Sequence, residues 1–327
     1  MPWRCPGPGA TRDRRRRHRA RGRGLSGRAA APRLSDHDSE LRRFARYADQ
    51  RGHAGPLDAE FQITWARLHV AHTTAGTGTR RLETLRPFVR YYRQFEPGSV
   101  EVDPCFLGAK RGRLTPHIYT PDEIDALVRA AARLKSSDAL RPATYATLLG
   151  LLAATGMRRA EALNLRDTDI DPDGRRLTIR LTKFRKHRQL PLHPSTAAAL
   201  VAYRRERDRQ WPCVPERPFF VGHDGTAVNA STLASVFVNL RRSLGWRARG
   251  DYAEPRLHDL RHTFAVHRLL RWHEGSLPID QGMFWLCTYL GHAKISDTYW
   301  YLTGVPELMA IAGRAFEAFA ADAEQRS

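Results

Sequence analysis

Residues 177–192 read LTIRLTKFRKHRQLPL, and their apolar residues follow the period of a strand within a chain that is otherwise helical. Leu177, Ile179 and Leu181 alternate with polar residues, as expected for a half-buried strand. A basic turn follows and leads to a return strand around Leu190. The stretch therefore predicts a small antiparallel hairpin.

Helical patterns lie on both sides of this hairpin. Thr120, Pro121 and Glu123 fit the N-cap, N1 and N3 positions of a helix that starts with a capping box. Apolar spacings of three and four predict further helices at about residues 142–154, 195–207, 230–244, 258–271, 281–289 and 306–321. The predicted fold class is mainly α with a small antiparallel β-sheet (α+β).

Composition divides the chain into four parts. Residues 1–35 consist mostly of Arg, Gly, Pro and Ala, so they cannot bury enough apolar surface to order alone. Residues 36–106 show two amphipathic runs and predict a small helical domain. Residues 107–119 lack a period and are rich in Pro, Gly and basic residues, which indicates a linker. Residues 120–327 are expected to form the second domain.

The net charge favours a polyanionic partner. The 327 residues include 54 Lys or Arg and 34 Asp or Glu, which gives a formal charge of +20. Half of this excess, +10, lies in residues 1–35, and the remainder of the chain therefore carries +10 of its own. The N-terminal segment is either a basic arm that follows DNA phosphates or an extension without a role.

Other patterns argue against several classes of protein. No apolar run reaches the length of about 18 residues that a membrane helix needs, and no apolar segment of a secretory signal is present. The Arg-rich, acid-poor N-terminus is also compatible with an organelle-targeting peptide. The four cysteines are far apart, which argues against a disulfide framework or a zinc site. We expect a cytoplasmic, nucleoid-associated bacterial protein without a metal or cofactor.

Several residues are suited to cutting DNA without a metal. Arg158 and Arg261 could bind the two non-bridging oxygens of a phosphodiester, because a guanidinium group is a planar, permanently charged fork. Lys183, in the hairpin turn, could protonate the leaving 5′ oxygen. A tyrosine could form a covalent link that stores the bond energy. Tyr299 and Tyr301 lie about 200° apart on a helix that Ser296-Asp297 could cap, so one of them can face the phosphate.

The spacing places further residues beside these candidates. His258 lies three residues before Arg261, and the two side chains therefore share one helix face. Glu161 lies three residues after Arg158 and can orient that side chain, either as a structural ion pair or as a direct participant.

Basic residues elsewhere are candidates for DNA binding. Arg90 and Arg93 lie on the outer side of the second amphipathic run, where phosphate contact and simple solvation are both consistent with the spacing. The remaining candidates are Lys110 and Arg111 in the linker, and Arg185 and Lys186 in the hairpin turn.

Four segments together resemble the signature boxes of the tyrosine recombinase (phage integrase) family, which includes the Xer and Cre recombinases. They are TGMRRAEALNL (155–165), LTKFRKHRQLPL (181–192), RLHDLRHTFA (256–265) and LGHAKISDTYWYLTG (290–304). The catalytic residues that this resemblance implies are Arg158, Lys183, His258, Arg261, His292 and Tyr301. The nucleophile of the family follows the last histidine by nine residues, which selects Tyr301 over Tyr299.

The resemblance also implies a function and an assembly. It implies a site-specific recombinase that exchanges DNA strands through a 3′-phosphotyrosyl intermediate, with residues 36–106 as a DNA-binding core-binding domain. The working form would be a homo-tetramer on paired DNA sites, alone or with related recombinase subunits. The apolar residues within 306–321 would dock on a neighbouring protomer or pack on their own domain. YWYLTG (299–304) resembles integrases of mobile elements.

Some departures and alternatives accompany this interpretation. Phe184 replaces a frequent glycine of the family, Arg159 replaces an aliphatic residue, and residues 271–287 are longer and richer in aromatic side chains. Two other functions share parts of the pattern. One is a type IB topoisomerase-like DNA relaxer, and the other is a DNA-binding accessory subunit that does not cleave.

Overall fold

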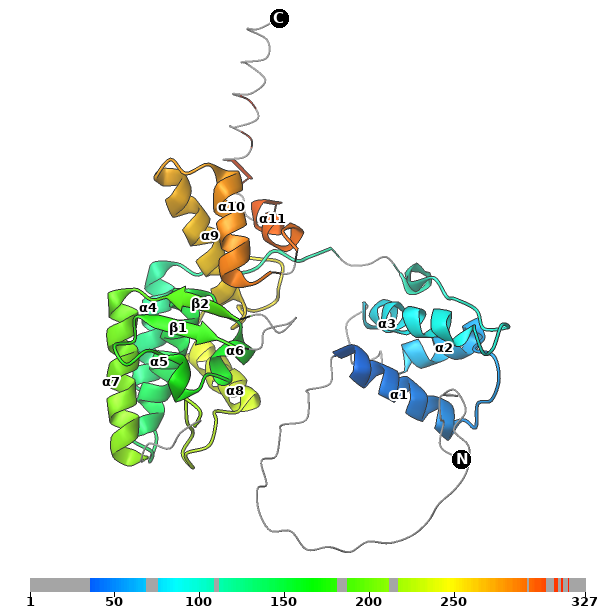
Figure 1. Ribbon diagram of the computed structural model, residues 1–327, viewed down its shortest axis with the longest axis horizontal. Coiled ribbons are helices and arrows are strands. Elements are labelled where there is room, and N and C mark those ends of the chain that lie inside the picture. Colours follow the sequence, from blue (N-terminus) through cyan, green and yellow to red (C-terminus); the bar gives the residue numbers. More distant parts are fainter. Residues whose placement is uncertain are drawn as a thin grey trace, which may run out of the picture. The chain divides into compact units, whose positions relative to one another are not determined.

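The computed structural model describes residues 36–68, 76–108, 112–180, 187–211, 217–292 and 294–303, together with residues 309, 310, 313 and 317. The chain divides into two compact units, residues 1–113 and 114–327 (Figure 1). Each unit is described by itself. Residues 1–35, predicted to be unstructured, lie outside the described residues.

Unit 1 is helical. Its elements are α1 (Asp36–Gln50), α2 (Ala59–Arg67), α3 (Thr77–Tyr92) and the 3₁₀ helix η2 (Pro104–Leu107). Phe44 of α1, Trp65 of α2 and Leu85 of α3 are buried together in one apolar cluster. The rings of Phe44 and Trp65 meet edge to face at 5.0 Å, a favoured arrangement of aromatic pairs.

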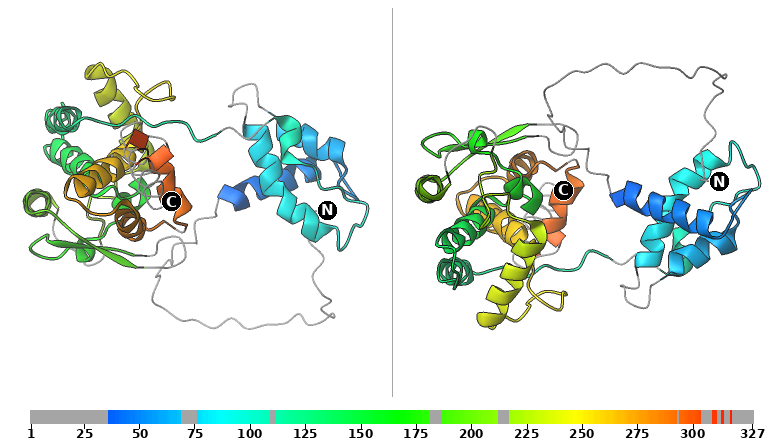
Figure 2. Two further views of the ribbon diagram at one scale, coloured as in Figure 1. Left: turned by 90° about the horizontal axis from the view of Figure 1, so that it is seen from above. Right: turned by 90° about the horizontal axis from the view of Figure 1, so that it is seen from below.

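Unit 2 contains most of the chain (Figures 1 and 2). Its elements are α4 (Pro121–Ala132), α5 (Leu140–Thr155), α6 (Arg159–Leu163), η3 (Asp167–Asp169), β1 (Arg176–Ile179), β2 (Arg188–Pro191), α7 (Pro194–Gln210), α8 (Ala230–Ser243), α9 (Asp259–Glu274), α10 (Ile279–Leu290) and α11 (Ser296–Thr303). The capping box at the start of α4 is present as predicted, with Thr120 and Glu123 exchanging hydrogen bonds. The mainly helical fold with one small antiparallel sheet is confirmed.

The two strands pair antiparallel, as the alternating pattern predicted. Leu177 lies opposite Leu190, and Ile179 lies opposite Arg188. The two leucines are buried, whereas Leu181 lies outside the described residues. This register places Arg188 at the point where the chain returns to the sheet.

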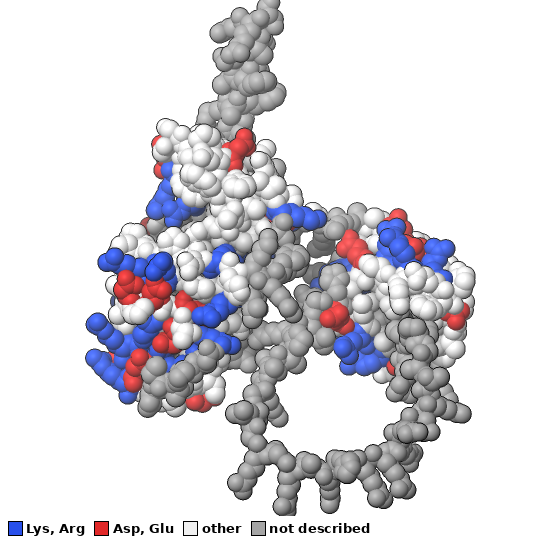
Figure 3. Space-filling model, viewed as in Figure 1, with Lys and Arg blue, Asp and Glu red and all other residues white. Residues whose placement is uncertain are grey.

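The surface of unit 2 mixes charges of both signs. Figure 3 shows basic side chains interspersed with acidic ones on one face of this unit. Some arginines are even buried: Arg207 of α7 is fully inaccessible and lies 2.6 Å from Asp167 and 2.8 Å from Asp208. Part of the positive charge is therefore neutralised by ion pairs inside the fold and cannot contact a binding partner.

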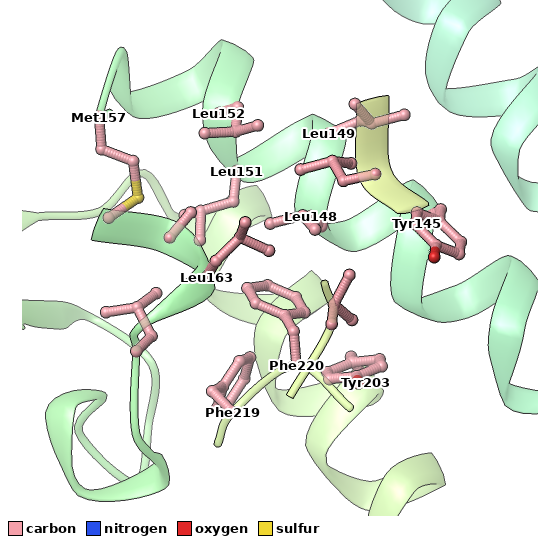
Figure 4. Close-up of a cluster of buried hydrophobic side chains, with 14 of the residues drawn as sticks. Tyr145, Leu148, Leu149, Leu151, Leu152, Met157, Leu163, Tyr203, Phe219 and Phe220 are labelled. Atoms are coloured by element: carbon pink, nitrogen blue, oxygen red, sulfur yellow. The ribbon is translucent and has the colours of Figure 1, made fainter. Parts of the chain in front are cut away.

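Helix α5 forms the centre of the core. Its side chains pack against α4, α7 and α9, so leucines point in several directions from one helix. Figure 4 shows Leu148 and Leu151 of α5 among Leu163 of α6, Tyr203 of α7 and Phe220. Because α5 is held on several sides, its C-terminal end is a rigid support for the turn that follows.

A second apolar cluster joins α9, α10 and α11 at one end of unit 2 (Figure 1). Phe264 of α9, Leu286 of α10 and Tyr301 of α11 are buried in it. The predicted helix at 306–321 lies mostly outside the described residues. No helix within the described parts of the chain has the length and apolar character needed to cross a membrane.

Part of the predicted linker is attached to unit 2. The backbone N–H of Thr115 donates to Asp251 at 2.8 Å, and that of Tyr119 donates to Thr263 of α9 at 2.9 Å. The Tyr119 side chain is completely buried. Residues 115–119 therefore belong to the edge of this unit, which a composition rich in Pro and Gly did not indicate.

Candidate active site

The turn between α5 and α6 presents Arg158. Gly156 ends α5 with a left-handed φ of 59°, and Arg158 is the N-cap of α6. The Arg158 Nη1 donates to Glu161 Oε1 at 3.0 Å, and its Nη2 donates to the carbonyl oxygen of Gly291 at 3.1 Å. The guanidinium group is held from two sides, yet 37% of the side chain is exposed.

Glu161 also binds a second arginine, which comes from the hairpin. Arg188 of β2 donates to both carboxylate oxygens of Glu161, at 3.1 Å and 2.8 Å. Burial alone would raise the pKa of Glu161, but its bonds to Arg188, and then to Arg158, hold that pKa below its ordinary value. Glu161 is thus a largely enclosed anion that pairs with Arg158, the neighbour that its spacing predicted.

Arg261 lies in the first turn of α9 and is 4% exposed. Its Nη1 donates to the carbonyl oxygen of Gly156 at 2.7 Å, and its Nη2 donates to that of Leu290 at 2.9 Å. Burial, and then the nearby charge of Arg158, lower its pKa to about 10, whereas Tyr301 acts in the opposite direction. Arg261 is therefore still a cation at neutral pH. The two candidate arginines meet at the segment Leu290–Gly291 that ends α10.

Two histidines stand at the start of α9. His258 is the N-cap residue and is exposed on one side, and its pKa is lowered by desolvation and by Arg261. His262 is more deeply placed, and burial, followed by repulsion from His258, lowers its pKa to about 3. Its ring lies 4.9 Å from that of His258 and 5.6 Å from that of Tyr301. His262 is thus a neutral packing partner of the tyrosine.

His292 follows the left-handed Gly291, whose φ of 67° ends α10. The His292 Nδ1 lies 2.7 Å from the hydroxyl of Thr298. Its ring is nearly parallel to that of Tyr301, with centroids 6.3 Å apart. Together the two contacts fix the histidine beside α11.

The two tyrosines of α11 have different surroundings. Tyr301 is 2% exposed and faces the histidines, whereas Tyr299 is 38% exposed and its hydroxyl donates to Asp280 of α10. Ser296 and Asp297 were predicted to cap this helix, but α11 already begins at Ser296, so both residues lie in its first turn. The structure thus packs Tyr301 beside His262 and His292 and leaves Tyr299 at the surface against Asp280.

The remaining predicted residues are distributed as follows. Arg90 lies in the last turn of α3 in unit 1 and Arg93 is the C-cap residue of that helix; both are exposed and pair with Glu101, at 3.0 Å and 3.5 Å. Hydrogen bonding to Arg90 lowers the pKa of Glu101, which Arg86 also contacts. One carboxylate thus pairs with three arginines, so a net positive charge remains around Glu101 on the surface of unit 1. Outside the described residues are Lys110, Arg111, Lys183, Arg185 and Lys186.

Sequence reasoning overlooked the backbone partners of the arginines and the role of Arg188. The sequence shows Arg188 as one more charge in a basic turn, because its partner Glu161 lies far away in the chain. The available signal was its position at the start of the return strand, two residues before the apolar Leu190. Among the described residues, no group of three or more His, Cys, Asp or Glu side chains is arranged to hold a metal ion.

Comparisons with known proteins place this geometry in context. A profile of the phage integrase family matches residues 118–305. The putative integrase/recombinase y4rB of Sinorhizobium fredii is 36% identical over 265 residues, which cover 80% of this chain and 84% of that protein. The tyrosine recombinase XerC of Nitrobacter winogradskyi is 32% identical, over 69% of this chain and 66% of that protein.

Solved structures share the fold. The Tn1549 transposon integrase in complex with transposon right end DNA matches with a TM-score of 0.63, 16% identity and coverage of 89% of this chain and 96% of that chain. The XerH site-specific recombinase bound to palindromic difH substrate matches with a TM-score of 0.60 and 18% identity, over 86% of this chain and 79% of that chain. At these identities the likeness shows the fold alone.

Proposed function

The chain belongs to the phage integrase family and is a tyrosine-type site-specific DNA recombinase, and we propose that Tyr301 is its nucleophile. The observation that carries this proposal is the convergence of distant side chains at the end of α10. Arg158 and Arg261 both donate to carbonyl oxygens of Leu290–Gly291, and Tyr301 packs on His292 directly after that segment.

The two arginines would stabilise the reacting phosphate. The scissile phosphodiester carries one negative charge, and a second charge develops in the pentacoordinate transition state. Arg158 and Arg261 are held by hydrogen bonds before any substrate arrives, so little reorganisation is needed when that charge appears. The partly exposed side chain of Arg158 is the one that DNA can reach most directly.

The covalent steps then balance without a metal or nucleotide. The Tyr301 hydroxyl attacks the phosphorus, the bond to the 5′ oxygen breaks, and a 3′-phosphotyrosyl link forms. Lys183 donates a proton to the leaving 5′ oxygen, while His258 and His292 bind the phosphate or accept the tyrosine proton. A 5′ hydroxyl from a partner duplex reverses the reaction, because the link conserves the energy of the broken bond.

The wider assignment follows from the same membership. Double-stranded DNA is the substrate, which agrees with the net charge of +20. We propose that residues 36–106 bind DNA, that four copies act on two paired sites, alone or with related subunits, and that the enzyme serves a mobile element. Relatives from bacteria support a cytoplasmic enzyme that acts on the nucleoid.

A nicked suicide substrate tests the nucleophile. The nick lets the short fragment that carries the released 5′ hydroxyl diffuse away after cleavage, so the covalent complex accumulates and migrates as a slower band on a denaturing gel. We expect the band with the unmodified protein and with Tyr299→Phe, but not with Tyr301→Phe. A band that persists in Tyr301→Phe would disprove the assignment.

The same system separates recombination from the two alternatives. With two duplexes of different length, a recombinase yields products that join parts of both. A type IB relaxer would relax supercoiled DNA without such products, and a non-cleaving accessory protein would bind DNA without any covalent band.

A further inference from the structure

Arg188 of β2 is largely enclosed within the candidate site. Its side chain is 13% exposed, and both terminal nitrogens bond to Glu161. Its Nε is buried without a hydrogen-bond partner among the described residues. A buried ion pair is weak evidence for stability, since desolvation offsets much of the attraction. Its presence therefore suggests a purpose other than holding the fold together.

The second contact of Arg188 is with the segment that carries the site. A Cβ added to Gly291 would lie 2.7 Å from the Nη1 and 3.1 Å from the Cζ of Arg188. The guanidinium group therefore lies directly against the main chain of Gly291. The carbonyl oxygen of this same residue accepts from Arg158 Nη2. Both anchors of the Arg158 side chain, Glu161 and Gly291, thus touch Arg188.

We propose that Arg188 is a positioning residue for Arg158, acting through the shared carboxylate of Glu161 and through its contact with Gly291. This inference rests on the proposed function, in which Arg158 binds the scissile phosphate.

Charge gives the physical reason. Without Arg188, the full charge of Glu161 would fall on Arg158, and the carboxylate would compete with the phosphate for that guanidinium. With Arg188 present, Glu161 is divided between two cations. Arg158, Arg188 and Arg261 against Glu161 give the cluster a net charge of +2, which matches the two negative charges of the transition state.

The hairpin sets the position of Arg188. Its backbone pairs with Ile179 in the sheet, while the strands hold Leu177 and Leu190 in the core. The sheet therefore holds Arg188 in position to bond to Glu161 in the candidate site.

A neutral substrate provides the test. A methylphosphonate replaces one non-bridging oxygen of the scissile phosphate by a methyl group, which leaves that linkage uncharged. Its cleavage therefore depends less on a well-placed guanidinium group. We would measure single-turnover formation of the cleaved product on this substrate and on the ordinary phosphate, for the unmodified protein, Arg188→Ala and Arg188→Lys. The matched control is Arg176→Ala, which removes an exposed arginine of β1 that pairs with Asp171.

We expect Arg188→Ala to slow cleavage of the phosphate by about 10²-fold, the effect of misplacing a catalytic group by about an ångström. On the methylphosphonate, the slowing of cleavage caused by Arg188→Ala should be smaller by about tenfold or more. Arg188→Lys, which keeps the charge but not the fork, should lie between. Arg176→Ala should resemble the unmodified protein on both substrates.

Equal losses on the two substrates would overturn the proposal, because they would mean that Arg188 does not act on the stabilisation of charge. If Arg188→Ala does not fold, the ratio between substrates for Arg188→Lys decides in the same way. Failure of the proposed function would look different, since the unmodified protein itself would then form no covalent complex with the ordinary phosphate.

Discussion

Arg261 lies in a nearly closed site, where its guanidinium group donates to the main-chain carbonyls of Gly156 and Leu290. A lysine at this position would retain a cation, but a single ammonium group cannot reproduce the planar fork that spans both carbonyls. We expect Arg261→Lys to slow formation of the covalent complex by about 10²- to 10³-fold, the usual cost of losing a preorganised donor. Single-turnover cleavage of the suicide substrate measures this. Arg271→Lys, at the exposed end of α9, is the control, and equal rates for the two variants would contradict the role.

Buried histidines should make the stability of the protein depend on pH. Burial lowers the pKa of His262 to about 3 and also lowers that of His117 and His267. Above the ordinary pKa of about 6.5, folded and unfolded chains are both neutral at these residues. Below it the unfolded chain binds protons first, so the free energy of unfolding falls by up to about 1.4 kcal/mol per pH unit for each histidine.

Urea denaturation between pH 7 and pH 5 measures this effect, because carboxylates with lowered pKa values titrate below that window. We expect stability to decrease toward pH 5, and His262→Phe to reduce the slope while keeping an aromatic ring beside Tyr301. An unchanged free energy of unfolding across the window would show that these imidazoles are not held neutral by the fold.

At the scale of elements, Gly156 in the turn between α5 and α6 can be compared with Gly245, which lies just after the end of α8. Gly156 and Gly245 have similar left-handed φ values, 59° and 65°. A Cβ on Gly156 would lie 2.5 Å from the ring of Phe264, whereas one on Gly245 would meet nothing within 4 Å. We expect Gly245→Ala to cost about 1 kcal/mol for backbone strain, and Gly156→Ala about 1–3 kcal/mol more for overpacking.

Denaturant unfolding measures both variants, and the suicide substrate gives a second measurement. Gly156 supplies a carbonyl to Arg261, so its replacement should also reduce cleavage, which Gly245→Ala should leave intact. Equal losses of stability in the two variants would mean that the ring of Phe264 moves aside at little cost.

The elements also show which features the sequence could predict. The start of α4 was predicted to the residue, because Thr120 and Glu123 interact within one turn. The hairpin was predicted because the alternation that begins at Leu177 is local. The bonds from Arg188 to Glu161 and from Arg261 to Leu290 join segments far apart in the chain, and no short-range pattern records them.

For the candidate site, local spacing alone left Tyr299 and Tyr301 equivalent. Resemblance to the family selected Tyr301, and the packing of α11 on α9 and α10 buries Tyr301 and turns Tyr299 toward Asp280. The reaction itself is a stricter test, because burial of a tyrosine is equally typical of a core residue.

For the molecule as a whole, formal charge overstates what is available to DNA. Arg204 and Arg207 are engaged by Asp167 inside unit 2, and three arginines of unit 1 share Glu101. Such pairs leave fewer cations to replace the counterions of a duplex. The salt dependence of binding therefore counts the phosphates that are contacted, which the net charge does not.

Comparing the full chain with residues 36–327 makes this measurement decisive. The truncated protein keeps a formal charge of +10 and both described units, so we expect it to retain DNA binding whose log–log slope against salt is about −0.9 for each phosphate contacted. If residues 1–35 act as a basic arm, the full chain will show a steeper slope, and if they have no role the two slopes will coincide. Fluorescence anisotropy with a labelled duplex at several salt concentrations gives both slopes. A slope near zero for the truncated protein would contradict the view that the folded units themselves bind the phosphate backbone.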